Sequence, residues 1–148
     1  MPRYNFTVNN LSGGAVTVQP LIRQLEHTLK TMRPQLPPLE LSFVLVTAQT
    51  MRGLNKQYHR QNRVTDVLSF SSSDIIICPD VLKQQARRVG EPFWVFLAHA
   101  LVHGVVHAAG YHHEPKGKKG KQAIKLEETI LAKMGVGHNH KNTRALKH

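Results

Sequence analysis

The spacing of apolar residues along the chain predicts strands and helices in alternation. Residues 3–8 alternate between polar and apolar side chains, which is typical of a strand with one buried face. In residues 16–32 the apolar side chains recur every three or four positions, as on the buried face of a helix. The mostly apolar run 39–47 predicts a second, largely buried strand. A short helix is expected next, with Thr47 as its N-terminal cap and its end near Tyr58.

The second half of the chain shows the same two periodicities. Two short strands, 66–70 and 74–78, are separated by only three residues, which favours a hairpin although no Asn-Gly turn is present. A helix is expected over 79–89, between a proline that can open it and a glycine that can end it. Residues 114–121 are expected to form a charged loop, and residues 122–134 a final helix.

The most apolar stretch of the chain runs from Phe93 to Ala109 and carries no charged residue except histidine. A helix that is apolar nearly all round normally lies at the centre of a small domain. We therefore predict an α+β fold, in which a small mixed sheet packs with helices around this central helix. One domain is expected over residues 1–136, because 148 residues with 41% hydrophobic side chains suffice for a single core. Residues 137–148 are expected to form a basic C-terminal arm.

Three histidines in and just after this helix have the spacing of metal ligands. His103 and His107 are four residues apart, about 6 Å along a helix, so both rings project from one face. Gly110 can end the helix and turn the chain back, which would bring His113 in as a third ligand. Three imidazoles leave the fourth position of a tetrahedral Zn²⁺ to water, as in catalytic zinc sites. The sequence therefore predicts one bound ion, Zn²⁺ or another divalent metal.

Two nearby positions bear on which histidines bind the ion and on which reaction the site could catalyse. His99 is also four residues from His103, but it is eight from His107, about 12 Å along the helix, and the two cannot share an ion. We expect His99 to line the pocket. Gly104 stands where the metzincin protease motif has the glutamate that acts as general base, which disfavours a zinc protease.

The charge and cysteine content bear on partners and compartment. Twenty Lys and Arg against nine acids give a formal net charge of +11, which favours nucleic acid or an anionic membrane surface as a partner. No uninterrupted apolar run of about 18 residues and no secretory signal are present, so we expect no membrane span. A single cysteine, Cys78, excludes an intramolecular disulfide and fits a reducing intracellular compartment, either bacterial cytoplasm or an organelle matrix.

Four stretches of the chain match a known family pattern in order. Residues 54–55 and 65–70 are L-N and T-D-V-L-S-F, and residues 74–77 are D-I-I-I. Residues 103–113 are H-G-V-V-H-A-A-G-Y-H-H. Together they resemble the YbeY family of single-domain, metal-dependent endoribonucleases, whose signature is H-G-x-x-H-x-x-G-Y-D-H. The resemblance covers about residues 50–135.

The resemblance implies a zinc-dependent endoribonuclease that acts in ribosomal RNA maturation and small-subunit assembly. Its partners would be ribosomal RNA and small-subunit ribosomal proteins. Asp66 and Ser69 are expected near the pocket. Basic side chains would neutralise RNA phosphates, and the candidates are Arg63, Lys116, Lys118, Lys119, Lys121, Lys141, Arg144 and Lys147.

Two departures from the family pattern leave a second function open. His59, with Arg60 next to it, stands where the family has an arginine expected to contact the scissile phosphate. A histidine lacks the permanent charge and the two-pronged hydrogen bonding of arginine, so His59 and Arg60 are only candidate phosphate contacts. His112 replaces an aspartate beside the last ligand, which removes a negative group from the pocket. The alternative is a weakened or inactive YbeY-like protein that binds RNA or the ribosome and keeps the metal site.

Overall fold

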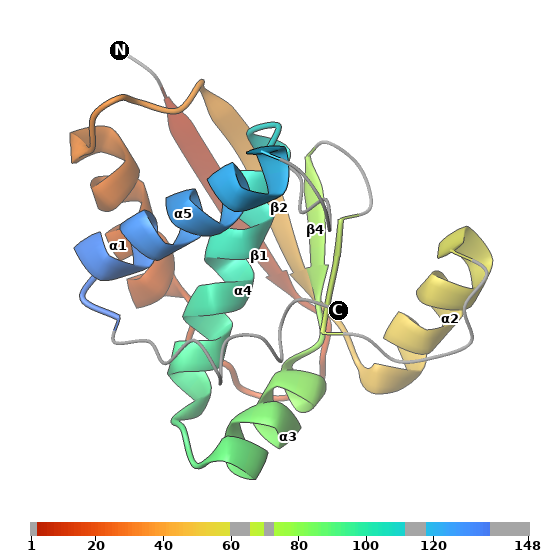
Figure 1. Cartoon of the computed structure of the whole chain (residues 1–148). Helices are drawn as coiled ribbons and strands as arrows, with labels where there is room; N and C mark the ends of the chain where they lie inside the picture. The colour runs from red at the N-terminus through yellow and green to blue at the C-terminus, as the bar shows by residue number, and fades with distance from the viewer. Residues whose placement is uncertain (1–2, 60–65, 70–72, 112–117, 137–148) are drawn as a thin grey trace.

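The computed structural model describes residues 3–59, 66–69, 73–111 and 118–136, without the side chains of residues 59, 118 and 119. Within these residues the chain forms strands and helices in the order that the hydrophobic pattern predicts (Figure 1). The elements are β1 (Tyr4–Asn10), α1 (Gln19–Thr31), β2 (Leu39–Leu45), α2 (Ala48–His59), β3 (Val67–Ser69), β4 (Asp74–Ile77), α3 (Pro79–Val89), α4 (Phe93–Ala108) and α5 (Lys118–Lys133).

The strands form a mixed sheet in the order β1-β2-β4-β3. β1 pairs with β2, and β2 with β4, in parallel. β3 pairs with β4 in antiparallel orientation, with Val67 opposite Ile77 and Ser69 opposite Ile75. The predicted mixed sheet and the predicted hairpin are therefore confirmed.

The two faces of the sheet are covered by different helices. On β4, Ile75 and Ile77 point into the main core, which also includes buried side chains of α1, α4 and α5. Ile76 points to the opposite face, where it packs in a smaller cluster with Leu68 and with Met51 of α2. Figure 1 shows α4 and α5 on one side of the sheet and α2 set apart beside β3 and β4. Alternate residues of β4 therefore pack into two different cores, because successive side chains of a strand point to opposite faces of the sheet.

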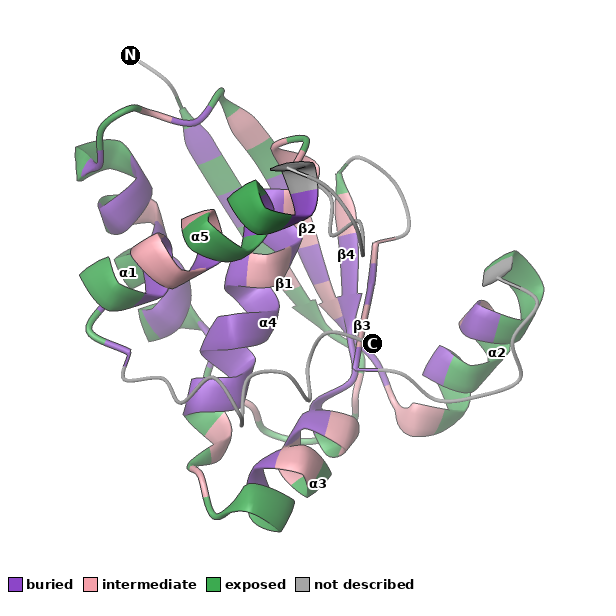
Figure 2. Cartoon of the chain, viewed as in Figure 1, coloured by how far each residue is buried: buried purple, intermediate pink, exposed green. Residues whose placement is uncertain are grey.

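The central helix is α4, as the sequence predicts. Eleven of its sixteen residues are buried, and Figure 2 shows most of the helix in the buried colour. None of the described helices is both long enough and apolar enough to cross a membrane. Cys78 is buried, and its thiol is free.

α4 lies directly against β4 at Gly104. A Cβ atom at this position would be 2.8 Å from Cγ2 and 3.2 Å from Cγ1 of Ile75, so only glycine fits there without a shift. This contact fixes which side of α4 faces the sheet. Successive residues of a helix are rotated by about 100° around its axis. His103 and His107 are therefore both displaced to the same side of Gly104 around α4.

Local capping residues set several helix ends where the sequence places them. Thr47 Oγ1 accepts a hydrogen bond from the backbone N–H of Thr50 at 3.1 Å, which caps α2. Gly90 ends α3 with φ of 73°. Gly110 has φ of 99°, and just after it the N–H of Tyr111 donates to the carbonyl of Val106. The chain therefore turns after α4 at the predicted position.

The start of α5 differs from the prediction. The sequence places residues 118–121 in a charged loop, whereas the helix already begins at Lys118. Lysine is a good helix former, and the cost of one glycine, about 1 kcal/mol, is small beside the packing of a buried face. Gly120 and Ala123 are both buried, so the first turns of α5 already belong to the core.

Candidate metal centre

His103 and His107 lie side by side on α4. Their ring centroids are 6.1 Å apart, with an angle of 28° between the ring planes. Both residues are half-buried, whereas most of the helix around them is fully buried. The i, i+4 spacing therefore produces the arrangement expected from helix geometry, in which two imidazoles can reach one ion from the same face.

A buried glutamate on α5 contacts the first of these histidines. Oε1 of Glu127 is 3.2 Å from Nδ1 of His103, and the exposed fractions of the two side chains are 5% and 20%. The sequence analysis missed Glu127, although a signal was present. Ala123, Ile130 and Met134 form the apolar face of the final helix, and Glu127 occupies a position on that same face. A carboxylate does lie beside the candidate ligands, although position 112 does not supply one.

The other candidate pocket residues take different places in the fold. His99 is buried, one turn before His103 on α4. Ser69 pairs opposite Ile75, the residue that packs against Gly104, so β3 ends close to where α4 meets the sheet. The sequence predicts both residues near the pocket, and that placement stays a prediction.

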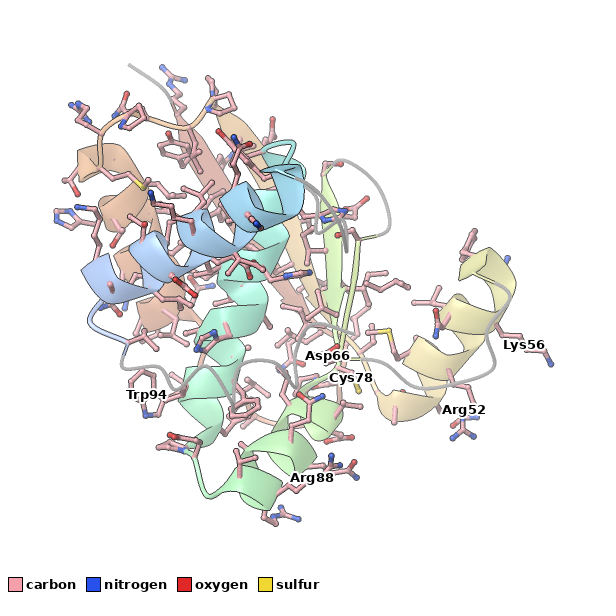
Figure 3. The ribbon with its side chains drawn as sticks, viewed as in Figure 1. Arg52, Lys56, Asp66, Cys78, Arg88 and Trp94 are labelled. Atoms are coloured by element: carbon pink, nitrogen blue, oxygen red, sulfur yellow. The ribbon has the colours of Figure 1, made fainter. Side chains whose placement is uncertain are left out.

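Asp66 lies where β3 begins, next to Cys78 (Figure 3). Its Oδ1 accepts a hydrogen bond from the N–H of Val67 at 3.0 Å, and its carbonyl oxygen accepts one from the N–H of Cys78 at 2.8 Å. These contacts anchor the start of the β3–β4 hairpin. Burial raises the pKa of the Cys78 thiol, and the nearby carboxylates of Asp80 and Asp66 raise it further, so the thiol stays protonated at neutral pH.

Several predicted site residues lie outside the described part of the chain. Of the predicted RNA-binding residues, Lys121 has a described side chain, and it is exposed in the first turns of α5. Within residues 3–59, 66–69, 73–111 and 118–136, no three His, Cys, Asp or Glu side chains form a group that could hold a metal ion. The residues or side chains outside the description are those of His59, Arg60, Arg63, His112, His113, Lys116, Lys118, Lys119, Lys141, Arg144 and Lys147.

Comparison with known proteins decides the family. The family model for Endoribonuclease YbeY matches residues 8–135, which is most of the chain. The chain belongs to the YbeY endoribonuclease family. The resemblance in the sequence begins at about residue 50. The match to the YbeY model also covers earlier elements, namely the end of β1 and all of α1 and β2.

Individual YbeY proteins agree with the family match. Endoribonuclease YbeY of Aquifex aeolicus is 35% identical over 106 residues, which are 65% of this chain and 71% of the relative. Endoribonuclease YbeY of a Polaromonas species is 31% identical over 119 residues, covering 76% of this chain and 73% of the relative. A solution structure from Thermotoga maritima is similar in fold, with a TM-score of 0.66 and 26% identity, covering 86% of this chain and 88% of that one.

Proposed function

We propose that this chain is a zinc-dependent endoribonuclease that acts on ribosomal RNA during maturation and assembly of the small ribosomal subunit. The observation that carries the proposal is the pair of half-buried imidazoles on one face of α4, in a chain of the YbeY family. Its partners would be ribosomal RNA and small-subunit ribosomal proteins, in bacterial cytoplasm or an organelle matrix.

The histidine pair fits a metal ion chemically. Imidazole nitrogen is a preferred ligand of Zn²⁺, and the two rings are near-parallel at a separation that allows both to face one ion. Nδ1 of His103 is next to a carboxylate, and a histidine held in this way binds a metal through Nε2. Gly110 turns the chain immediately after α4, and His113 would be the third ligand. A bound Zn²⁺ would supply Lewis acidity towards water and a phosphate oxygen.

Basic side chains of the protein itself would bind the RNA strand. α2 ends at His59. At this position the family has an arginine that is expected to contact the scissile phosphate. Arg52 and Lys56 lie one turn apart on the exposed side of the same helix and project away from the sheet (Figure 3). Basic side chains at this spacing can neutralise successive phosphates of a backbone. The net charge of +11 strengthens binding to any RNA, whether or not cleavage follows.

A second candidate function is RNA or ribosome binding with weak or absent cleavage. It is favoured by His59, which carries no permanent charge at the place of an arginine. Stabilising negative charge that develops on phosphate oxygens needs a cation fixed against them, and a neutral imidazole does this poorly. Arg60 is the next residue in the sequence, and it lies outside the described residues.

A cleavage assay on structured ribosomal RNA with added Zn²⁺ separates the two functions. The enzyme hypothesis predicts cleavage that is abolished by His107→Ala and unchanged by His27→Ala, a matched exposed histidine on α1. If cleavage occurs, His59→Arg should increase it. RNA binding without cleavage, even in the double variant His59→Arg and His112→Asp, would favour the second function. A chain that neither binds nor cuts RNA would contradict both.

A further inference from the structure

The contact between Glu127 and His103 joins α5 to the candidate metal centre across 24 positions of sequence. Glu127 is among the buried polar residues of the described chain, with 4% of its surface exposed. A carboxylate is rarely buried unless it has a polar partner, because desolvation penalises its charge. One polar partner of Glu127 is a ring nitrogen of a candidate metal ligand.

Stability alone does not account for a glutamate at this position. α5 is already held in the main core by Ala123, Ile130 and Leu131, each of which is at most 2% exposed. Replacing a buried ion pair with apolar residues of similar volume is often neutral or stabilising. Apolar residues in place of both Glu127 and His103 would therefore dock α5 at least as well. Stability alone does not explain the pair, so a role for Glu127 in the chemistry of His103 is the better explanation.

We propose that Glu127 is a positioning residue for metal binding. Its carboxylate accepts a hydrogen bond from Nδ1–H of His103, which fixes the ring orientation and the tautomer that leaves the lone pair on Nε2. This inference rests on the metal site of the proposed function. Carboxylates that hold a metal-binding histidine in this way also raise its basicity, and their loss typically costs about 10- to 100-fold in metal affinity.

The negative charge of Glu127 should also strengthen metal binding. The ligands are neutral imidazoles, so a divalent cation would bring two uncompensated positive charges into a chain whose net charge is already +11. A carboxylate that is 5% exposed, next to one ligand, is poorly screened by water and offsets part of that charge. Glu127→Ala removes both the charge and the hydrogen bond, whereas Glu127→Gln keeps an oxygen that can accept the hydrogen bond.

The test compares the full-length chain with Glu127→Ala, Glu127→Gln and the control Glu128→Gln. Glu128 is the next residue on α5 and points about 100° away around the helix. Zn²⁺ affinity is measured by competition with a chromophoric chelator. The tautomer of His103 is measured without metal, from its ring ¹⁵N shifts at a pH where the ring is neutral. In Glu127→Ala we expect a roughly 10- to 100-fold loss of Zn²⁺ affinity together with loss of the Nδ1–H tautomer. In Glu127→Gln we expect a smaller loss of affinity, with the tautomer kept. In Glu128→Gln the affinity should change by less than about twofold.

Two different failures can be told apart. If the unmodified chain binds Zn²⁺ but Glu127→Ala matches it in both affinity and tautomer, the role of Glu127 is overturned while the metal site stands. A lower melting temperature in that variant, with affinity and tautomer unchanged, would leave Glu127 a purely structural role and also overturn the inference. If the unmodified chain binds no Zn²⁺, the metal site of the proposed function fails, and the inference fails with it.

Discussion

Replacing Gly104 with alanine tests how α4 is seated on the sheet. Alanine in a helix interior is normally more stable than glycine by about 1 kcal/mol. The new Cβ would, however, lie 2.8 Å from Cγ2 of Ile75, a side chain with no exposed surface. Carbon atoms pack best at about 3.5–4.0 Å, so the helix and strand would have to separate by a sizeable fraction of an ångström.

The clash should outweigh the gain in helix propensity. Overpacking a buried contact costs about 1–3 kcal/mol, and the upper end applies because the clash involves a backbone-attached atom and a β-branched side chain on a strand. The expected net loss for Gly104→Ala is therefore about 2 kcal/mol. Gly53, in α2, is the matched control, since no atom lies within 4 Å of its added Cβ. Gly53→Ala should raise stability by up to about 1 kcal/mol.

Urea unfolding of the single and double variants measures these effects. Ile75→Ala removes both atoms that clash and should itself cost about 2–5 kcal/mol. In that background Gly104→Ala should become neutral or stabilising, because its methyl group partly fills the space. Additive effects of the two substitutions, or a Gly104→Ala variant at least as stable as the unmodified chain, would refute this account of the packing.

Three further predictions concern the side chains of Thr47, Tyr4 and Lys121. Thr47→Ala should lower the free energy of unfolding by about 1 kcal/mol in urea titrations, because the N–H of Thr50 loses its cap. Tyr4→Phe should also cost about 1 kcal/mol, since the Tyr4 hydroxyl donates to the carbonyl of Leu36 at 2.6 Å. Burial raises the pKa of the Tyr4 hydroxyl above 10.0, although the charge of Arg33 opposes the shift. Above about pH 10 the unfolded chain therefore loses this proton more readily than the folded chain, and the free energy of unfolding should fall as the pH rises. The fall should be smaller in Tyr4→Phe, which lacks the hydroxyl. Lys121→Gln should reduce the slope of log affinity for single-stranded RNA against log salt by at most about 0.7, measured by fluorescence titration; an unchanged slope would remove Lys121 from the contacts.

Much of the secondary structure could be predicted because it depends on neighbouring residues. The cap at Thr47, the left-handed glycine Gly90 after α3 and the turn at Gly110 each act over one helical turn or less. The placement of His103 and His107 on one face is likewise a property of a single helix. The start of α5 was predicted four residues too late, because burial of Gly120 and Ala123 depends on contacts with other elements.

By itself, then, the sequence determined the periodic elements, the helix ends that Thr47, Gly90 and Gly110 set, and the pair of histidines, since these follow from chain geometry over a few residues. Only the tertiary structure decided the strand order β1-β2-β4-β3, the seat of Gly104 on Ile75 and the contact of Glu127 with His103. Hydrophobic spacing shows that a face is buried, but it does not show which distant element covers it. The sequence shows that Glu127 lies on the apolar face of α5. Only the fold shows that it contacts His103, which is 24 positions away in the sequence.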